Sequence, residues 1–597
     1  MDNDLQSIQE ARRLADEAYA AWKTYETYSE DQVDRILRAI ALAGVEHAER
    51  LARIAVEETG FGNVPDKTAK NIFGSRAVYE AMVPMRTIGI VRDDRANRIL
   101  EVASPVGVIA GIVPSTNPTS TTLYKALIAL KGRNAIVFSP HPSAVRAINE
   151  TVRVIREAAE GAGAPPGVVA SLMLPTMEAT TELMRSPRTA LILATGGPGL
   201  VRAAYSAGKP AFGVGPGNVP AYIERTADVP QAVADVLTGK CFDNGTLCSS
   251  EQAIVTDRVI AGQVRAELEA RGAFLCKGED KARLERTIRN SRGALNTAIV
   301  GKSAARIAEM AGIRIPSGTR ALVGEAGGVG PDHPLSMEKL SPVLAFYTVE
   351  DWREGCQLSI EILKFGGLGH TLGLHSNDDN VIRQFALQKP ASRICVNTPA
   401  ALGAVGYTTN LFPSMTLGCG SFGGNITSDN ISPLHLINLK RVAYGVRPAG
   451  GAGPDAASLD RVVPAPAVGA GQREHIRAIV DGWLQGRSPA GKRSAVPEAG
   501  ARPVPTVAEA VPANPDRSVA APPVGKPRRG PLERYDQIEV SSDRKPEAPG
   551  EPSPFVCEDD VRAADRRSGK ITVNARTIIT PSARELGDSL GVFLTVE

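Results

Sequence analysis

The chain has 597 residues, of which 43% are hydrophobic, and its formal net charge at pH 7 is +3. This length is too great for a single hydrophobic core, so two or more domains are expected. The small net charge offers no strong basic field for nucleic acid, and apolar stretches such as residues 106–113 are far too short to cross a bilayer. We therefore expect neither a nucleic-acid partner nor a membrane partner.

The N-terminus and the cysteines indicate a compartment. The first residues, Met-Asp-Asn-Asp-Leu, show neither the basic nor the apolar region of a signal peptide. The seven cysteines are scattered and include no Cys-x-x-Cys pair, so the sequence predicts no metal site and no disulfide framework. Reduced thiols in a cytoplasmic setting are the natural interpretation.

The pattern of apolar residues predicts helices first and then alternating strands and helices. Helical spacing of apolar positions among charged residues predicts helices over residues 5–59. From about 100 to 240, short apolar runs alternate with amphipathic stretches, which predicts a parallel sheet with crossover helices. The expected strands are 107–113, 135–138 and 191–194, and the expected helices are 121–130 and 144–159. Residues 241–425 repeat this style, with strands expected at 251–255 and 341–348.

The composition changes near residue 447. Thirteen prolines occur in the 66 residues 487–552, and such a segment cannot bury enough apolar surface to offset its ordering entropy. We predict a disordered linker there. Residues 472–485 place apolar side chains at i, i+3, i+4, i+7 and i+8, which predicts an amphipathic helix. Near the C-terminus, a helix opening at Glu558, a strand at 571–573 and a helix starting at Pro581 are expected.

Together these patterns predict an α/β chain with two parallel-sheet domains, a small oligomerisation flap, and a proline-rich linker that leads to a small terminal module. The expected segments are an NAD(P)-binding domain with N-terminal helices (1–240), a catalytic thiol domain (241–425), a return segment with an oligomerisation strand (426–450), a linker (451–471), the amphipathic helix (472–486), a disordered linker (487–552) and a targeting or docking module (553–597).

Cys248 has the surroundings of a nucleophile. It follows Asn-Gly by three residues and precedes Ser-Ser. Such small and polar neighbours leave room for a substrate and present backbone N–H groups to a developing negative charge. A buried structural thiol is the alternative. The other cysteines in the first 450 residues are better explained as core or surface thiols.

Four motifs occur in order along residues 5–445. They are Pro-Ser-Thr-Asn-Pro at 114–118, Ala-Thr-Gly-Gly-Pro-Gly at 194–199, Gly-Thr-Leu-Cys at 245–248 and Glu-Lys-Leu-Ser-Pro at 338–342. Together they resemble the NAD(P)-dependent aldehyde dehydrogenase superfamily. The segments 212–220, 242–252 and 366–371 narrow the resemblance to the CoA-acylating branch, which includes the aldehyde half of bifunctional alcohol/aldehyde dehydrogenases, sulfoacetaldehyde dehydrogenase and microcompartment aldehyde dehydrogenases.

The resemblance implies roles for individual residues. A Cys248 thiolate would attack the aldehyde, the side-chain amide of Asn117 and the backbone N–H of Cys248 would stabilise the oxyanion, and hydride loss would leave a thioester on sulfur. His370 would handle the proton of the coenzyme A thiol. The implied cofactor-binding residues are Pro114, Ser115, Ser139, His141, Thr195, Gly196, Gly197, Gly215 and Glu338, with Glu338 on the nicotinamide ribose.

Two departures from the wider family are informative. Hydrolytic members carry a Glu in a Glu-Leu-Gly-Gly segment, but the matching segment here is Val-Gly-Pro-Gly at 214–217. Without that base, attack by water loses on the order of 10²–10⁴-fold, so the acyl group is expected to pass to coenzyme A. The segment that binds the adenosine ribose has become Ser-Pro-His-Pro at 139–142 and lacks an acid. The branch favours NAD, and NADP stays open.

Simpler structural interpretations stand beside these roles. Asn117 before a proline suits a turn, Glu338 suits a solvated surface charge, and His370 suits a structural hydrogen bond. The turn at 195–197 suits an ordinary connection between a strand and a helix. The amphipathic helix could pack back on its own catalytic core.

The expected function is oxidation of a short-chain aldehyde to acyl-CoA with NAD(P) and coenzyme A, in a homodimer or homotetramer. Two rivals are a hydrolytic aldehyde dehydrogenase and a catalytically retired scaffold. The tail resembles encapsulation peptides and a short module of microcompartment enzymes. We therefore expect it to recruit the enzyme, through shell proteins or neighbouring enzymes, into a bacterial microcompartment in the cytoplasm.

Overall fold

A computed structural model describes residues 3–446 and, near the C-terminus, residues 553, 555–556, 558–567, 569–574, 577–579 and 581–595. The chain divides into two compact units, Met1–Val446 and Arg447–Glu597, which are treated separately below. The linkers predicted at 451–471 and 487–552 and the helix predicted at 472–486 lie outside the described residues.

The first unit begins with helices. They are α1 (Asn3–Tyr25), α2 (Glu30–Glu46), α3 (Ala48–Thr59), α4 (Val64–Ile72) and α5 (Val78–Met82). Helix α2 starts at Ser29, which forms a reciprocal capping box with Gln32. Helix α4 starts at Asn63, whose side chain accepts from the backbone N–H of Asp66, and it continues through a π-helical turn, η1 (Phe73–Ala77), into α5. These helices confirm the prediction for residues 5–59.

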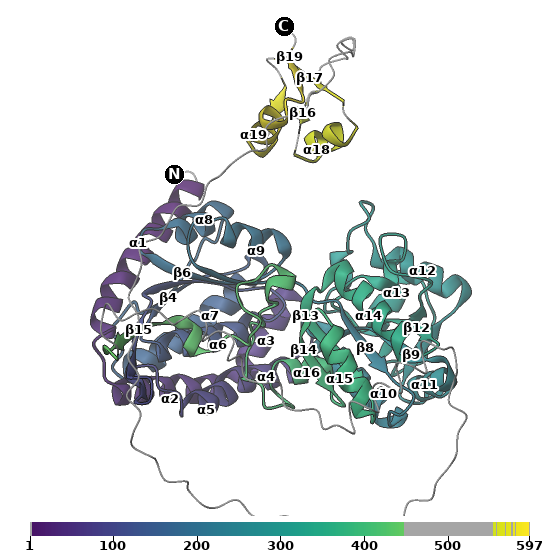
Figure 1. Ribbon diagram of the computed structural model, residues 1–597, viewed down its shortest axis with the longest axis horizontal. Helices are drawn as coiled ribbons and strands as arrows, with labels where there is room; N and C mark the ends of the chain where they lie inside the picture. Colours follow the sequence, from purple (N-terminus) through teal and green to yellow (C-terminus); the bar gives the residue numbers. More distant parts are fainter. Residues whose placement is uncertain are drawn as a thin grey trace, which may run out of the picture. The chain divides into compact units, whose positions relative to one another are not determined.

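The first parallel sheet has five strands in the order β5-β4-β3-β6-β7. Strands β4 and β6 of this sheet are labelled in Figure 1. Its strands are β3 (Val108–Ile112), β4 (Ala135–Ser139), β5 (Val169–Ser171), β6 (Thr189–Thr195) and β7 (Ala211–Val214). The intervening helices are α6 (Pro118–Lys131), α7 (Val145–Gly161), α8 (Met177–Arg185) and α9 (Pro198–Tyr205). Strands β3 and β4 are buried along their whole length, as expected of a parallel sheet covered on both faces.

The second parallel sheet has seven strands in the order β10-β11-β12-β9-β8-β13-β14. Its strands are β8 (Val219–Ile223), β9 (Glu251–Asp257), β10 (Ala273–Cys276), β11 (Ala321–Glu325), β12 (Val343–Val349), β13 (Gly369–His375) and β14 (Ala391–Val396). Its helices are α10 (Val229–Cys241), α11 (Arg258–Ala270), α12 (Gly278–Ile288), α13 (Ala304–Ala311), α14 (Trp352–Gly366), α15 (Asp379–Gln388) and α16 (Ala400–Ala404).

Alternate residues of this second sheet belong to two different cores. Ala221 and Ile254 pack in one cluster with α10 and α11, whereas Tyr222 and Val255 pack in the other with α12 to α15. This alternation follows from the two-residue period of a strand.

Both sheets confirm the predicted fold class. The sheets divide the chain between β7 and β8, however, whereas the sequence placed the boundary at 240. Residues 400–436 likewise supply members of the first core, such as Ala400 and Leu436.

A three-stranded antiparallel sheet completes the first unit. It has the order β1-β2-β15 and is formed by β1 (Gly89–Asp94), β2 (Ile99–Pro105) and β15 (Ile437–Ala443). Strand β15 pairs along the whole of β2, from Ile437 opposite Pro105 to Ala443 opposite Ile99. We call this sheet the flap. Its strand near 437–443 lies where the sequence placed the oligomerisation strand, whereas β1 and β2 had not been predicted.

The described residues of the second unit form a small α/β module. Its elements are β16 (Phe555–Val556), α18 (Glu558–Arg566), β17 (Ile571–Val573), β18 (Ile578–Ile579), α19 (Pro581–Leu590) and β19 (Phe593–Thr595). Strand β16 pairs with β18 and β17 with β19, both in parallel. A small core of Val556, Val561, Val573, Ala583 and Val592 holds the module together. The two predicted helices and the strand at 571–573 are present.

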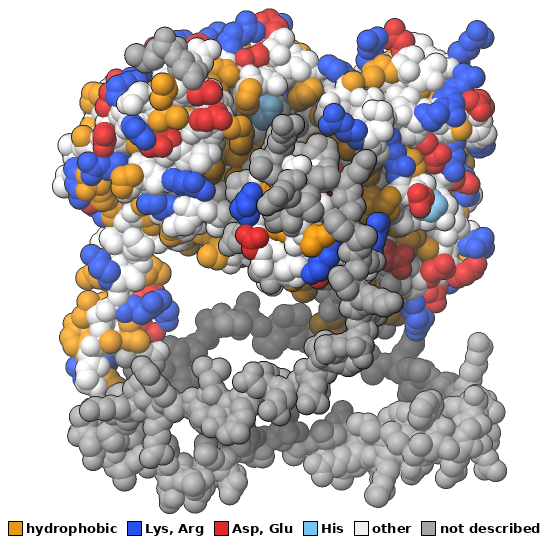
Figure 2. Space-filling model, turned by 90° about the horizontal axis from the view of Figure 1, so that it is seen from above, with side chains coloured by type: hydrophobic (Ala, Val, Ile, Leu, Met, Phe, Trp, Pro, Cys, Tyr) orange, Lys and Arg blue, Asp and Glu red, His pale blue; other side chains and the backbone are white. Residues whose placement is uncertain are grey.

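The surface carries both signs of charge. Figure 2 shows basic and acidic side chains interspersed over the visible face. Within the described ranges, no helix combines the length and apolarity that a membrane crossing needs. The same residues contain no group of three or more His, Cys, Asp or Glu side chains placed to hold a metal ion.

Candidate active site

A cavity of about 660 Å³ lies at the carboxyl ends of strands β3, β4, β6 and β7. In an open parallel sheet this is where connecting loops converge and ligands bind. All the predicted cofactor-binding residues line it: Pro114, Ser115, Ser139, His141, Thr195, Gly196, Gly197, Gly215 and Glu338. Asn117 and Cys248 line it too. The structure therefore brings together residues spread over more than 200 positions of the sequence.

Cys248 lies between a tight turn, η3 (Phe242–Gly245), and strand β9. Its side chain is half-buried, and its Sγ lies 3.2 Å from Nε2 of His370. Burial, and then the neighbouring charge of Glu338, raise the pKa of the thiol to about 12. In this state the sulfur is therefore a neutral thiol near pH 7 and becomes reactive only when its proton is removed.

His370 is fully buried at the start of β13. Its Nδ1 lies 2.9 Å from Oγ1 of Thr371, and its backbone carbonyl accepts from Nη2 of Arg393 at 3.1 Å. Burial, and then the nearby Arg393 cation, lower the pKa of His370 to about 3. The imidazole is therefore neutral at physiological pH and can exchange a hydrogen bond with the thiol. His370 does not line the main cavity. It contacts Cys248, which does line the cavity.

Asn117 forms the N-cap of helix α6 and is buried. Its Nδ2 donates to the backbone carbonyl of Thr246 and to Oγ1 of Thr116, both at 3.2 Å. Its Oδ1 accepts from the ammonium group of Lys70. The amide N–H group thus lies against the segment that carries Cys248, two residues before the thiol.

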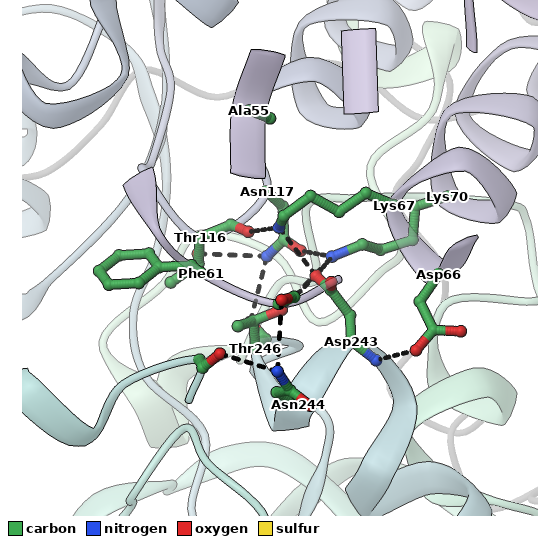
Figure 3. A network of polar contacts seen from close by, with 12 residues as sticks. Ala55, Phe61, Asp66, Lys67, Lys70, Thr116, Asn117, Asp243, Asn244 and Thr246 are labelled. Carbon is green, nitrogen blue, oxygen red and sulfur yellow. Dashed lines mark hydrogen bonds and ion pairs between the residues drawn. The ribbon is translucent and has the colours of Figure 1, made fainter. Parts of the chain in front are cut away.

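Lys70 belongs to a buried ion network that sequence analysis missed. Asp243 is fully buried and pairs with the ammonium groups of both Lys67 and Lys70 (Figure 3). The pairs with the two lysines bring the pKa of Asp243 below its usual value although burial alone would raise it. Burial lowers the pKa of Lys70 to about 8. The network connects helix α4 to the turn that precedes Cys248.

Glu338 is the only acidic side chain among the described residues that line the cavity. Its Oε1 accepts from the backbone N–H of Gly217 at 3.0 Å. Burial raises the pKa of Glu338 to about 8, opposed by this hydrogen bond and by the charge of Lys240. Lys240 is itself buried, and burial lowers its pKa to about 7.

The segment 214–217 passes very close to the backbone of Cys248 and to the ring of His370. A Cβ built on Gly217 would stand 2.2 Å from the backbone carbonyl of Cys248 and 3.0 Å from the ring of His370, so only glycine fits there. The residue types of this segment, Val-Gly-Pro-Gly, put no carboxylate beside the sulfur.

The side chains of three other predicted residues form hydrogen bonds within the chain. The hydroxyl of Ser139 pairs with that of Thr180 at 2.8 Å, and the hydroxyl of Thr195 pairs with that of Thr416 at 3.1 Å. Nδ1 of the exposed His141 accepts from the backbone N–H of Ser143 at 3.1 Å. Their neighbours Thr180 and Thr416 carried no motif that would have identified them.

Comparisons with known proteins place the chain in a family. The sequence model of the aldehyde dehydrogenase family matches residues 2–312. The chain belongs to this family. It is 44% identical over 442 residues to the bifunctional aldehyde-alcohol dehydrogenase of Escherichia coli strain K12, covering 73% of this chain and 50% of the relative. The chain thus spans about half the length of that protein.

Two solved structures are also similar. The crystal structure of an acetylating aldehyde dehydrogenase from Geobacillus thermoglucosidasius is 53% identical, with a TM-score of 0.75, and the match covers 76% of this chain and 100% of that one. A propionaldehyde dehydrogenase from the fucose utilisation bacterial microcompartment of Clostridium phytofermentans is 29% identical, with a TM-score of 0.65, and the match covers 74% of this chain and 98% of that one.

Proposed function

We propose that the protein is a CoA-acylating aldehyde dehydrogenase that oxidises a short-chain aldehyde through a thioester on Cys248. One observation carries this proposal. The Cys248 sulfur lies 3.2 Å from the neutral imidazole of His370, while the segment that would carry the base of a hydrolytic enzyme passes beside it without a carboxylate. The site therefore has a nucleophile and a proton acceptor but lacks the usual activator of water.

In the first half of the reaction the Cys248 sulfur adds to the aldehyde carbon. Because the resting pair is a neutral thiol and a neutral imidazole, the proton moves to Nε2 of His370 as the S–C bond forms. The aldehyde oxygen becomes an oxyanion. Its donors are the backbone N–H of Cys248 and Nδ2 of Asn117, which exchanges its hydrogen bond to Oγ1 of Thr116 for one to the oxyanion. The product of this step is a thiohemiacetal on the enzyme.

The cavity residues fit a nicotinamide dinucleotide. Gly197, Gly199 and Gly215 have open space where a Cβ would stand, and Oγ1 of Thr121 is a buried polar atom on the lining without a hydrogen-bond partner in the described structure. The N-terminus of α9 at Gly197 offers backbone N–H groups to a pyrophosphate, and the carboxylate of Glu338 suits a ribose hydroxyl. When bound, the dinucleotide accepts the hydride from the aldehyde carbon.

In the second half a thiol displaces Cys248 from the acyl group. His370 first releases to solvent the proton that it took from Cys248, which its low pKa favours. It then takes the proton of the coenzyme A thiol as the new thioester bond forms, and returns this proton to the Cys248 sulfur as the sulfur leaves. The balanced reaction converts aldehyde, NAD(P)⁺ and coenzyme A into acyl-CoA, NAD(P)H and one proton. Exchange of one thioester for another is nearly thermoneutral, so the enzyme is expected to work in both directions.

The room beside the thiol supports a short acyl chain. A side cavity of about 10 Å³ adjoins Leu247, Val405 and Met415, which also line the main cavity. Its remaining wall is apolar or aromatic, apart from Lys70: Ala69, Phe73, Phe242, Leu402 and Tyr407. A space of this size holds about one water-sized group, so an acetyl or propionyl chain fits better than a longer one.

One assay separates this proposal from its rivals. NADH formation is followed with acetaldehyde or propanal, with and without coenzyme A. Strict dependence on coenzyme A together with formation of acyl-CoA is expected. Turnover without coenzyme A would instead support hydrolysis, and no turnover with a range of aldehydes would support the scaffold.

Glu338 provides the control for the hydrolytic rival, because it is the carboxylate closest to the segment 214–217. If Glu338 only binds a ribose, Glu338→Gln raises the KM for the dinucleotide and leaves the rate of acyl transfer from preformed acyl-enzyme unchanged. A hydrolytic enzyme that used this carboxylate as its base would lose deacylation by roughly 10²–10⁴-fold.

The choice of dinucleotide is part of the proposal. Among the residues that the structure describes, no acidic side chain lines the cavity near Ser139 and His141, and none there repels a 2′-phosphate. We propose that NAD is the principal cofactor and that NADP is also accepted. The ratio of kcat/KM for the two dinucleotides tests this directly.

We further infer that the C-terminal tail recruits the enzyme, in the cytoplasm, into a bacterial microcompartment. The second unit, the apolar stripe in the sequence of residues 472–485 and the named origin of the Clostridium phytofermentans relative support this. A chain truncated to residues 1–450 is expected to lose co-purification with shells while it keeps activity. Retention of shell binding would refute the inference. Loss of stability without loss of shell binding would instead show that the tail packs on its own core.

A further inference from the structure

The orientation of the Asn117 amide decides whether it can stabilise an oxyanion. A primary amide has a donor end and an acceptor end of nearly equal shape, and only the N–H end can stabilise negative charge. In this protein the Oδ1 atom accepts from the ammonium group of Lys70, while Nδ2 lies against the carbonyl of Thr246. An ammonium group has donors only. In the reversed orientation, the N–H groups of the Asn117 amide would therefore point at the N–H groups of Lys70.

Lys70 is itself held by a carboxylate. Lys67 and Lys70 are one helical turn apart on α4, which places both ammonium groups against Oδ2 of Asp243 (Figure 3). The side chains of Lys67, Lys70 and Asp243 are 2%, 4% and 0% exposed, so solvent does not screen these contacts. Lys67 also donates to the backbone carbonyl of Thr116 at 3.0 Å, next to Asn117.

Asp243 is held in turn by the backbone around it. Its Oδ1 accepts from the backbone N–H of Asn63 at 2.9 Å, and its Oδ2 accepts from the hydroxyl of Thr246 at 2.6 Å. A Cβ on Gly62 would stand 1.8 Å from Oδ1, so glycine is required there. Asp243 has φ 48° and ψ 39°, in the left-handed region that non-glycine residues rarely adopt.

We propose that Lys70, oriented by Asp243, is a positioning residue that fixes the Asn117 amide with its N–H end toward the reacting carbonyl oxygen. Without the ammonium group, the carboxylate of Asp243 would attract the N–H end of the amide and turn it away from the substrate. Lys70 therefore acts on the oxyanion through Asn117, although it also borders the side cavity. The inference rests on the proposed function only for the identity of the oxyanion-forming step.

The test uses the acylation of Cys248 by p-nitrophenyl acetate, followed as the burst of p-nitrophenol, in the full-length chain. This step forms an oxyanion at the same sulfur but needs neither dinucleotide nor coenzyme A. Lys70→Met is expected to slow the burst roughly 10- to 100-fold, the range for loss of a charge-assisted orientation. Lys70→Gln, whose amide can still donate to Asn117, is expected to lose less. Equal losses in the two variants would refute the proposal.

A double-mutant cycle separates positioning from general structural damage. Because Lys70 acts through Asn117, adding Lys70→Met to Asn117→Ala is expected to slow the burst by less than about threefold. Multiplication of the two single effects would overturn the inference. Lys131→Met is the matched control, since Lys131 is another buried lysine paired with an aspartate, Asp34, at the other end of α6. Lys131→Met is expected to change the burst rate by the same factor in the wild-type background and in the Asn117→Ala background.

The same experiment keeps the two proposals apart. If the wild-type enzyme shows the burst but never transfers an acyl group to coenzyme A, the proposed function fails and the role of Lys70 is still measured. If coenzyme A is acylated normally but Lys70→Met retains the wild-type burst rate, the positioning role fails and the proposed function stands.

Discussion

At the scale of single residues, the site keeps its reactive groups neutral until substrate arrives. The pKa of Cys248 is raised and that of His370 is lowered, mainly because both are withdrawn from water. A permanently ionised thiolate would be open to oxidation and alkylation. The hydrogen bond of 3.2 Å between sulfur and Nε2 provides the route by which the proton leaves when the sulfur attacks.

The pH dependence of alkylation tests this account of the thiol. Iodoacetamide reacts with the thiolate, whose fraction rises with pH until the pKa is passed. With a pKa of about 12, the rate of Cys248 modification should rise about tenfold per pH unit from pH 7 to pH 10. Peptide mapping by mass spectrometry, with Cys248→Ser as the control, isolates this thiol from Cys241. A plateau below pH 9 would contradict the prediction.

The predicted site residues lie close to elements that the local sequence pattern identifies. The site residues that sequence analysis missed depend on contacts with residues far away in the sequence. Asn117 and Thr195 come soon after the strands predicted at 107–113 and 191–194, so the fold alone brings them to one edge of the sheet, whereas the strand before Gly215 was not predicted. Lys70 lies in a short helix rich in polar residues, which favours a solvated position. Its function depends on Asp243, which is 173 residues away, and no periodicity or local motif encodes that contact.

At the scale of elements, the turn η3 and helix α4 position the site jointly. The turn presents Asp243 to α4 and returns the chain so that Cys248 faces the cavity. The π-helical turn η1 that continues α4 carries Phe73, which borders the side cavity. One continuous helical segment thus supplies both Lys70 and Phe73, and both residues border the side cavity.

Phe73 is therefore predicted to limit the length of the substrate. Phe73→Ala opens the side cavity, and each additional buried methylene of the aldehyde contributes about 0.8 kcal/mol, or roughly fourfold in kcat/KM. The ratio of kcat/KM for pentanal to that for acetaldehyde should rise at least roughly tenfold over the wild-type ratio. Leu127→Ala, in the core of the first sheet, serves as a matched loss of volume away from the cavity. An unchanged ratio in Phe73→Ala would show that another wall sets the limit.

The flap is the element that sequence patterns identified least well. Strand β1 contains Arg92, Asp93 and Asp94 and has no apolar face, so nothing in its pattern indicated a strand. It pairs with one edge of β2, and the other edge of β2 pairs with β15, which is more than 300 residues later. Long-range pairing of this kind leaves little local signal.

At the scale of the whole molecule, the flap points to self-association. Nearly every residue of β15 is exposed, including Leu439 at 40% and Val442 at 44%. Tyr444, which follows β15, and Ile90, in β1 at the other edge of the flap, are also about half exposed. A thin sheet with apolar side chains on open faces is typical of a surface that another chain covers. We propose a second copy of this chain as that partner.

Substitution of the flap tests this proposal. Leu439→Asp combined with Val442→Asp places two charges in the contact, so the variant should be monomeric in light scattering at concentrations where the wild type is a dimer or tetramer. The five-stranded and seven-stranded sheets do not depend on these side chains, and circular dichroism should be unchanged. A wild type that is monomeric, or a variant that still associates, would contradict the prediction.

The central claim concerns the fate of the acyl group on Cys248, and mass spectrometry of a single turnover tests it most directly. Enzyme is mixed with propanal and NAD in the absence of coenzyme A, and the intact protein and its Cys248 peptide are weighed over time. We predict a propionyl adduct on Cys248 that persists in water and is discharged as propionyl-CoA as soon as coenzyme A is added. An adduct that disappears equally fast without coenzyme A, or no adduct on Cys248, would contradict the account.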